Sequence, residues 1–345
     1  MMNKKPMFDF VIGNPPYQEN REKAADKPIY HEFMQAVYPI ANETMLITPA
    51  RFLFNAGGTP KCWNKKMLSS PHFRVLKYIA EAQEAFPQTD IKGGVAIHQY
   101  SQNKLSQPIE VFYPFNELRS ILQKTTQHPQ FAPIKDIMYS HSAYTFTKIA
   151  EQELSQYKEI FDNKITFGTN CFSIFSTGVF FDKIPGPLNR YVQMYGRDTT
   201  GRICKYIKAS YVNDPGNLNY WKVFLPNSNG CGALGEPLST PVIGQPVIGH
   251  TETFISIGTF TSEAEATACL SYIKTKFARC MLGILKATQH NGPEKWIYVP
   301  LQDFTAHSDI EWSQSVANID KQLYTKYGLS QAEIDFIESH VKEME

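Results

Sequence analysis

The residues best suited to chemistry are Asn14, Pro15, Pro16 and Tyr17, which follow one another directly. The Asn14 side-chain oxygen and the Pro15 carbonyl oxygen are hydrogen-bond acceptors, and the two prolines restrict the backbone that carries them. Two fixed acceptors suit an amino group that donates both of its hydrogens, such as the exocyclic amine of adenine. Because that nitrogen shares its lone pair with the ring, it needs stabilisation of positive charge as it becomes tetrahedral and attacks a methyl group.

Tyr17 adds an aromatic face on which a base can stack. Such stacking is worth about 1–3 kcal/mol per base, comparable with the few kcal/mol needed to swing a base out of a duplex. The other interpretation of these four residues is a rigid turn without chemistry. The chemical interpretation is favoured by the apolar run directly before Asn14 and by Gly13, which allows close backbone approach.

Strand-like and helix-like patterns alternate over the first hundred residues and position this loop. Apolar runs predict strands at Phe8–Gly13, Thr44–Thr48, Val75–Ile79 and Gly94–Tyr100. A helix is predicted where apolar residues recur at four-residue spacing, at Ile29, Phe33 and Val37. Strands separated by helices predict a mostly parallel sheet with helices on its faces. Ligands of such sheets bind at the carboxyl ends of the strands.

The string from Phe8 to Tyr17 resembles the catalytic motif of N6-adenine-specific DNA methyltransferases. Later segments resemble further motifs of this family in their usual order, at Tyr30–Phe33, Met45–Leu53, Phe86-Pro87 and Gly93–Ile97. The stretch from Trp296 to Ser330 is similar to the tail of type II restriction-modification methylases. The resemblance implies an α/β protein that methylates adenine at a specific site in double-stranded DNA, with S-adenosyl-L-methionine as methyl donor. It assigns the catalytic role to Asn14, Pro15, Pro16 and Tyr17.

The chain departs from this family in the donor-binding segment, where a strand, a glycine-rich turn and an acidic residue hold the donor. Only thirteen residues precede Asn14, too few for a strand–helix–strand unit. Gly230–Gly235 fits the pattern GxGxxG, but Glu236–Pro241 cannot open a helix, so we predict a loop. We therefore expect a partial Rossmann-like methyltransferase sheet over residues 1–105, with a bare apolar edge at Phe8–Ile12. A separate polypeptide, self-association at this edge or an interrupted reading frame would each account for it.

The remainder of the chain is predicted to recognise DNA. Residues 106–135 are a polar connector, and residues 136–345 are an α+β target-recognition domain with C-terminal helices. Strand-like runs stand at Ile165–Phe167, Cys171–Phe175, Val179–Phe181 and Trp296–Val299. Two helices have start signals: Ser262 with Glu265 precedes a helix over residues 266–285, and Ser330 with Glu333 precedes the last helix.

Basic residues interleaved with tyrosines in this region suit contact with phosphates and bases. They are Arg190, Arg197, Arg202, Lys205 and Lys208, to which the helix over residues 266–285 adds Lys274 and Arg279. The alternative for any one of them is a solvated surface side chain. Two functions remain open. One is an adenine methyltransferase of a restriction-modification system that is active when its donor half is present, and the other is a truncated, non-catalytic module that binds DNA or a partner.

Composition argues against several other classes of protein. The net charge of +1 means that a local basic patch, rather than the global charge, must hold any nucleic acid. Six cysteines without CxxC spacing and nine histidines without HxxxH spacing argue against a metal site and fit the reducing cytoplasm. We find no apolar stretch long enough to cross a membrane, no phosphate-binding GxxxxGK[ST] loop and no GxSxG elbow.

Overall fold

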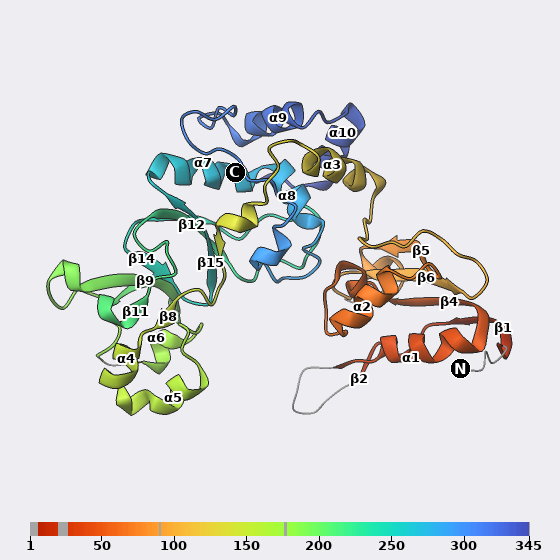
Figure 1. The fold of residues 1–345 in the computed structure, drawn as a ribbon, viewed down its shortest axis with the longest axis horizontal. Helices are drawn as coiled ribbons and strands as arrows, with labels where there is room; N and C mark the ends of the chain where they lie inside the picture. The colour runs from red at the N-terminus through yellow and green to blue at the C-terminus, as the bar shows by residue number, and fades with distance from the viewer. Residues whose placement is uncertain (1–5, 20–26, 90, 176–177, 345) are drawn as a thin grey trace. The chain divides into compact units, whose positions relative to one another are not determined.

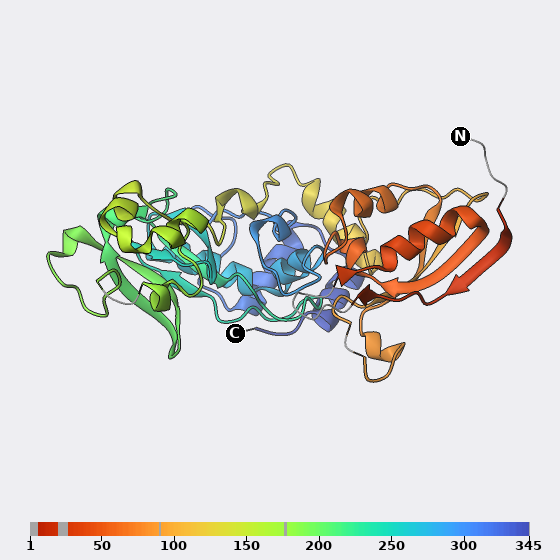
Figure 2. The same cartoon turned by 90° about the horizontal axis from the view of Figure 1, so that it is seen from below.

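The computed structural model describes residues 6–19, 27–89, 91–175 and 178–344, which form two compact units (Figures 1 and 2). Unit 1 contains the described residues up to Arg119 together with Cys231–Leu234 and Gly283–Thr288. Unit 2 contains the rest of the described chain. The helix α3 (Asn116–Thr126) begins in unit 1 and continues into unit 2. Residues 106–135, predicted as a polar connector, therefore include a helix.

Unit 1 is built on a four-stranded sheet with the order β1-β4-β6-β5. Its strands are β1 (Phe8–Gly13), β4 (Ala41–Pro49), β5 (Phe73–Ile79) and β6 (Val95–Ser101), which confirms the four predicted strands. The expectation of a mostly parallel sheet is wrong for the pairing, because β1 is parallel to β4 whereas β6 is antiparallel to both β4 and β5. The described chain between β5 and β6 carries only a short 3-10 helix, η3 (Ala82–Glu84), and parallel pairing needs a longer crossover.

One face of this sheet carries the core of unit 1. The helices α1 (Tyr30–Val37) and α2 (Lys61–Leu68) contribute buried side chains that join those of the sheet, among them Met34, Trp63 and Phe73. The helix α1 was predicted from Ile29, Phe33 and Val37, but its fully buried face is the neighbouring one, with Tyr30 and Met34. Phe33 is 41% exposed. The helix predicted from the four-residue spacing is confirmed, but the prediction of which face is buried is wrong.

The strand β1 lies at an edge of the described sheet and is apolar. Phe8, Phe10 and Ile12 are 50%, 70% and 77% exposed. Their neighbour on the same face, Met45 of β4, is paired with Ile12 and is also exposed. The predicted bare apolar edge at Phe8–Ile12 is thus confirmed for the described part of the chain. Natural sheets seldom leave such an edge uncovered, because it offers unpaired backbone groups beside apolar side chains.

Unit 2 is a mixture of small sheets and helices. A four-stranded sheet has the order β13-β12-β15-β7, a three-stranded sheet has the order β10-β9-β14, and β8 pairs with β11. The strands are β7 (Met138–Tyr139), β8 (Thr145–Phe146), β9 (Tyr191–Asp198), β10 (Gly201–Lys208), β11 (Val212–Asn213), β12 (Trp221–Pro226), β13 (Val242–Gly244), β14 (Ile248–His250) and β15 (Phe254–Phe260). The helices are α4 (Lys148–Glu153), α5 (Lys158–Asn163), α6 (Cys171–Ile174), α7 (Glu263–Lys274), α8 (Lys276–Gly283), α9 (Val316–Lys326) and α10 (Gln331–His340).

Several elements of unit 2 differ from the prediction. The single helix expected over residues 266–285 is broken at Thr275, whose backbone is extended, and the buried Asp320 accepts the amide hydrogens of Lys276 and Phe277 at 2.9 Å to start α8. The run Cys171–Phe175 forms the helix α6 rather than a strand. Ile165–Phe167 and Val179–Phe181 contribute only isolated bridges, and Trp296–Val299 forms a turn. Most apolar side chains of these runs are buried, which produces a strand-like pattern, but the runs pair too little with their neighbours to form strands.

The two predicted helix starts are present. The Ser262 hydroxyl accepts the amide hydrogen of Glu265 at the start of α7. Ser330 and Glu333 form a reciprocal capping box at the start of α10. Capping residues act within one turn of chain, which is why these starts could be recognised without knowledge of the tertiary structure.

Candidate active site

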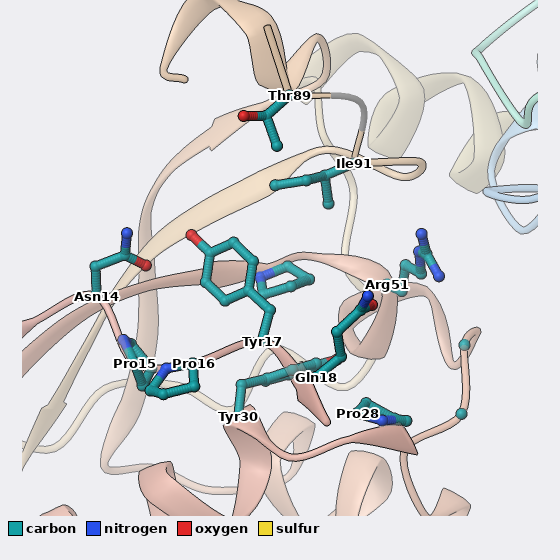
Figure 3. Close-up of a pocket in the computed structure, with 13 residues that line it drawn as sticks. Asn14, Pro15, Pro16, Tyr17, Gln18, Pro28, Tyr30, Arg51, Thr89 and Ile91 are labelled. Atoms are coloured by element: carbon teal, nitrogen blue, oxygen red, sulfur yellow. The ribbon is translucent and has the colours of Figure 1, made fainter. Parts of the chain in front are cut away.

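The loop after β1 opens onto a cavity of about 720 Å³ in unit 1. Asn14, Pro15, Pro16 and Tyr17 all line this cavity (Figure 3). They follow the carboxyl end of β1, and the chain that leaves the parallel neighbour β4 at Pro49 lines the same cavity. Active sites of parallel strand pairs lie at this end. The cavity is large enough for a nucleotide-sized ligand, since small-molecule sites range from about 300 to 1,000 Å³.

Asn14 and Tyr17 differ in how they meet the cavity. The Asn14 side chain is exposed, whereas the Tyr17 ring is half-buried. The Tyr17 carbonyl accepts the amide hydrogen of Ile29 at 3.1 Å, which fixes the loop against the start of α1. The Tyr17 ring meets Phe86 edge-on, with 6.5 Å between the ring centroids. Figure 3 shows the ring rising from the loop towards Ile91, with the Asn14 amide beside it.

The Tyr17 hydroxyl is buried beside the Asn14 side chain. Burial raises the pKa of this phenol, and the nearby Asn14 side chain opposes the rise. The Tyr17 phenol is therefore neutral at physiological pH.

The other lining residues were not predicted as site residues, although Tyr30, Pro49 and Arg51 lie in segments that resemble later motifs of the family. They are Gln18, Pro28, Tyr30, Pro49, Arg51, Gly57, Gly58, Thr89 and Ile91. The signal that would have found Arg51 is the one used for Asn14, because Arg51 stands just beyond the carboxyl end of a predicted strand parallel to β1. Thr89 and Ile91 lie far along the chain, and only the folded structure brings them to the cavity.

Gly230–Gly235, the one match to GxGxxG, runs through a loop as predicted. No helix begins directly after it, and the next helix along the chain is α7, which starts at Glu263. A glycine-rich turn holds a ligand through the amides of a following helix N-terminus, and these residues do not provide one. Gly230–Gly235 therefore does not have the geometry of such a glycine-rich turn.

The strongest basic feature of unit 2 is a pair of arginines on the β9–β10 hairpin. Arg197 and Arg202 are directly opposite each other in the antiparallel pairing and are both exposed. Arg202 donates a hydrogen bond to the Thr240 carbonyl at 2.7 Å and lies 5.6 Å above the Phe254 ring. The pair lines a cavity of about 520 Å³ to which Asn227 also contributes. Like charges placed opposite each other destabilise a hairpin, so this arrangement is one that an anion would relieve.

The other predicted DNA-binding residues divide into three groups. Lys205 pairs with Asp182 at 2.7 Å, and Lys208 pairs with Glu153 at 2.8 Å, so their charges are compensated within the protein. Arg190 is exposed and Lys274 partly exposed. The prediction for Arg279 is wrong: it is 2% exposed and donates to backbone carbonyls of Lys274, Gly235 and Lys342. It stabilises the chain around α8 and has no surface to offer DNA.

The described residues contain no group of three or more His, Cys, Asp or Glu side chains arranged to hold a metal ion. None of their helices is long and apolar enough to cross a membrane.

Comparison with known proteins finds similarity to methylases in the part of the chain that carries this site. Residues 1–86 match the family described as Eco57I restriction-modification methylase. The chain is 25% identical over 101 residues to an uncharacterised adenine-specific methylase of Mycoplasma pneumoniae. That match covers 28% of this chain and 24% of the methylase, so the chain spans about a quarter of its relative. These matches support a methyltransferase role, and the family match includes the Asn14–Tyr17 loop.

Two solved structures resemble the chain at low identity. The type IIL restriction-modification enzyme MmeI, solved in complex with DNA, has a TM-score of 0.37 and 9% identity, and the match covers 96% of this chain and 56% of that one. The type IIG restriction endonuclease BpuSI has a TM-score of 0.34 and 8% identity, and the match covers 93% of this chain and 50% of that one. The chain thus spans about half the length of each.

Proposed function

We propose that this chain carries the adenine-binding and DNA-recognition parts of a site-specific DNA adenine-N6 methyltransferase of a restriction-modification system. The observation that carries the proposal is the placement of Asn14–Tyr17 at the mouth of a cavity, at the carboxyl end of β1. Had this loop faced away from any opening, only a rigid turn would remain. The family match over residues 1–86 and the adenine-specific methylase relative agree with it.

In this mechanism the residues of the loop hold the amino group of an everted adenine. The Asn14 side-chain oxygen and the Pro15 carbonyl oxygen accept its two hydrogens, which favours a tetrahedral nitrogen with a lone pair free to react. The Tyr17 ring stacks on the base, and its anchoring through Ile29 and Phe86 keeps the platform in place before the base arrives. These contacts offset the cost of flipping, because stacking and unstacking are of similar size at about 1–3 kcal/mol.

We assign the methyl donor, S-adenosyl-L-methionine, to residues outside the described part of this chain. The exposed apolar edge at Phe8, Phe10 and Ile12 supports this assignment, because an additional strand beside β1 would cover it. That strand belongs to a separate polypeptide, to a second copy of this chain or to a further segment of a longer one. The donor-binding residues would then lie next to β1 and hence next to Asn14.

Recognition of double-stranded DNA is assigned to unit 2. Arg197 and Arg202 are exposed and form no ion pair in the described structure. They line one cavity together with Glu252, whose carboxylate is already bound by Lys164 and Thr166. Arginine at such a site binds phosphate or the acceptor edge of guanine through two parallel hydrogen bonds. Arg190 and Lys274 add exposed charge, whereas the paired Lys205 and Lys208 add little.

The proposal is tested by the rate of methyl transfer to adenine-containing duplexes. The assay combines the chain with whatever polypeptide covers β1, for which the product of a neighbouring reading frame is the first candidate. Asn14→Ala is expected to lower the rate by about 10²–10³-fold, the scale of losing one preorganised transition-state contact. Asn103→Ala removes an exposed asparagine of the same unit and is the matched control. A reduction under tenfold for Asn14→Ala contradicts its assigned role.

The bare β1 edge also favours a second candidate, a non-catalytic module that binds DNA or a partner protein. Such a module would use the cavity lined by Arg197 and Arg202 and the apolar edge of unit 1 for binding, and Asn14 would have no catalytic role. Retained DNA binding with no methyl transfer, in the presence of the polypeptide that covers β1, would favour this candidate.

A further inference from the structure

Arg51 is the basic residue that the described cavity of unit 1 contains, and the mechanism above does not use it. It stands at the start of the 3-10 helix η2 (Arg51–Phe54), directly after β4. Figure 3 shows it across the Tyr17 ring from Asn14. Arg51 lies beside the proposed base-binding loop but takes no part in the proposed contacts with the adenine amine, so a second role is expected for it.

The aliphatic part of Arg51 is held by two glycines. Gly57 and Gly93 have φ angles of +80° and +84°, which side chains rarely adopt. A Cβ atom at Gly57 would lie 3.1 Å from the Arg51 Cβ, and one at Gly93 would lie 2.9 Å from the Arg51 Cγ. At both positions, a side chain would therefore occupy space that the aliphatic part of Arg51 fills. The Arg51 Nε donates a hydrogen bond to the Lys92 carbonyl at 2.5 Å, which also orients the guanidinium.

The loop that follows Arg51 is fixed by buried hydrogen bonds. The amide of Ala56 donates to the Arg51 carbonyl at 3.0 Å. The side chain of Asn64, which is fully buried, accepts from the Thr59 hydroxyl at 2.7 Å and donates to the Asn55 side chain at 3.2 Å. A fixed loop means that Arg51 loses little conformational freedom when it binds a ligand.

The guanidinium is nevertheless uncompensated. Within the described chain no carboxylate forms an ion pair with Arg51, and its one hydrogen bond uses Nε. The two terminal nitrogens remain for a ligand. A planar guanidinium with two parallel donors matches two oxygens of a phosphate, and its positive charge disfavours a cationic ligand.

We propose that Arg51 binds a backbone phosphate next to the everted adenosine of the target strand. The inference rests on the proposed function, because the base enters the cavity through the Asn14–Tyr17 loop. It adds a second point of attachment, so that the nucleotide is held at its base by Asn14 and Tyr17 and at its phosphate by Arg51. Holding the sugar–phosphate backbone also stabilises the flipped state, because the nucleotide can return to the helix only after this contact breaks.

The test measures how much a phosphate group adds to the binding of 2′-deoxyadenosine. The ligands are 2′-deoxyadenosine, its 5′- and 3′-monophosphates and inorganic phosphate, titrated into the full chain with calorimetry or NMR. At least one monophosphate is expected to bind about tenfold or more tightly than the nucleoside, the scale of a charge-assisted hydrogen-bonded pair. Arg51→Gln is expected to remove this gain and leave the nucleoside affinity unchanged, and Arg51→Lys to keep part of it.

Two control variants separate the phosphate contact from other effects. Arg74→Gln removes an exposed arginine of the same unit that contacts Gln99, and it should leave the phosphate gain intact. Asn14→Ala should weaken nucleoside and monophosphates by the same factor. Equal weakening of all adenosine ligands by Arg51→Gln would show a structural role and overturn the inference.

The two proposals can fail separately. Arg51-dependent binding of inorganic phosphate without any gain from the base would support the phosphate site and contradict the adenine site. Binding of the nucleoside with no gain from phosphate would do the reverse. A wild-type chain that binds none of these ligands contradicts both.

Discussion

The arginine pair on the β9–β10 hairpin should lower the folding stability of the free protein and raise its affinity for DNA. Arg197 and Arg202 occupy directly opposite positions and carry no carboxylate partner in the described structure. Opposed like charges cost about 0.2–1 kcal/mol in a hairpin. Arg197→Gln removes one of the two charges and shortens the side chain only a little. It should therefore raise the free energy of unfolding by a few tenths of a kcal/mol or more.

The effect on DNA binding should have the opposite sign and a distinctive salt dependence. Each phosphate contact contributes a slope of about −0.9 to the plot of log affinity against log salt concentration. If both arginines bind phosphates, Arg197→Gln with Arg202→Gln should flatten the slope by about 1.8. Lys205→Gln should leave it almost unchanged, because Asp182 already compensates that charge at 2.7 Å.

Fluorescence anisotropy with a labelled duplex, repeated over a range of salt concentrations, measures this slope. Arg279→Met is the structural control, because Arg279 is 2% exposed and serves three backbone carbonyls. It should cost about 2–4 kcal/mol of stability and leave the slope unchanged in the folded protein. An unchanged slope in the arginine double variant would refute the assignment of the hairpin, and so would a loss of stability in Arg197→Gln.

Two further predictions concern unit 1. His98 is fully buried, its Nε2 lies 3.0 Å from the Thr48 hydroxyl, and burial lowers its pKa to about 3. Because the unfolded chain binds this proton below about pH 6.5, stability should fall as the pH drops from 6.5 towards 3, by about 2–3 kcal/mol at pH 4.5. Urea denaturation of His98→Gln should lack this loss relative to wild type, and an identical pH dependence in both proteins would contradict it. At the sheet edge, Phe10→Ser with Ile12→Ser should weaken association with the polypeptide that covers β1 by more than about 100-fold, since burying each side chain is worth about 1.5–3 kcal/mol. Sedimentation velocity checks this, with the exposed Leu105→Ser as control, and equal association of both variants would count against the edge.

Much of unit 1 could be predicted because local patterns determine it. The four strands of its sheet are short apolar runs between polar turns, and the strand before Asn14 was recognised at its exact bounds, Phe8–Gly13. The antiparallel direction of β6 could not be predicted, because it depends on the length and path of the connection between β5 and β6. The buried side of α1 could not be predicted either, since Phe33 and Met34 are equally apolar and only the position of the sheet distinguishes them.

In unit 2 the apolar pattern was less informative. Cys171–Phe175 has the composition of a buried strand, yet it forms one helical turn within an aromatic cluster that includes Phe146 and Phe167. Arg279 lies on a helix with other basic residues, and nothing in its immediate sequence shows that it also donates to two carbonyls of distant segments, those of Gly235 and Lys342. Burial of a charged residue is a tertiary property, and this is where sequence reasoning about DNA contacts failed.

The central claim is that Asn14 and its neighbours hold an adenine amine for methylation, and the identity of the modified nucleoside tests it most directly. DNA is treated with this chain, as wild type or as Asn14→Ala, together with the polypeptide that covers β1. The DNA is then digested to nucleosides and analysed by mass spectrometry. We expect N6-methyl-2′-deoxyadenosine from the wild type and about 10²–10³-fold less of it with Asn14→Ala. A methylated cytosine as the product, or undiminished N6-methyl-2′-deoxyadenosine with Asn14→Ala, would contradict it.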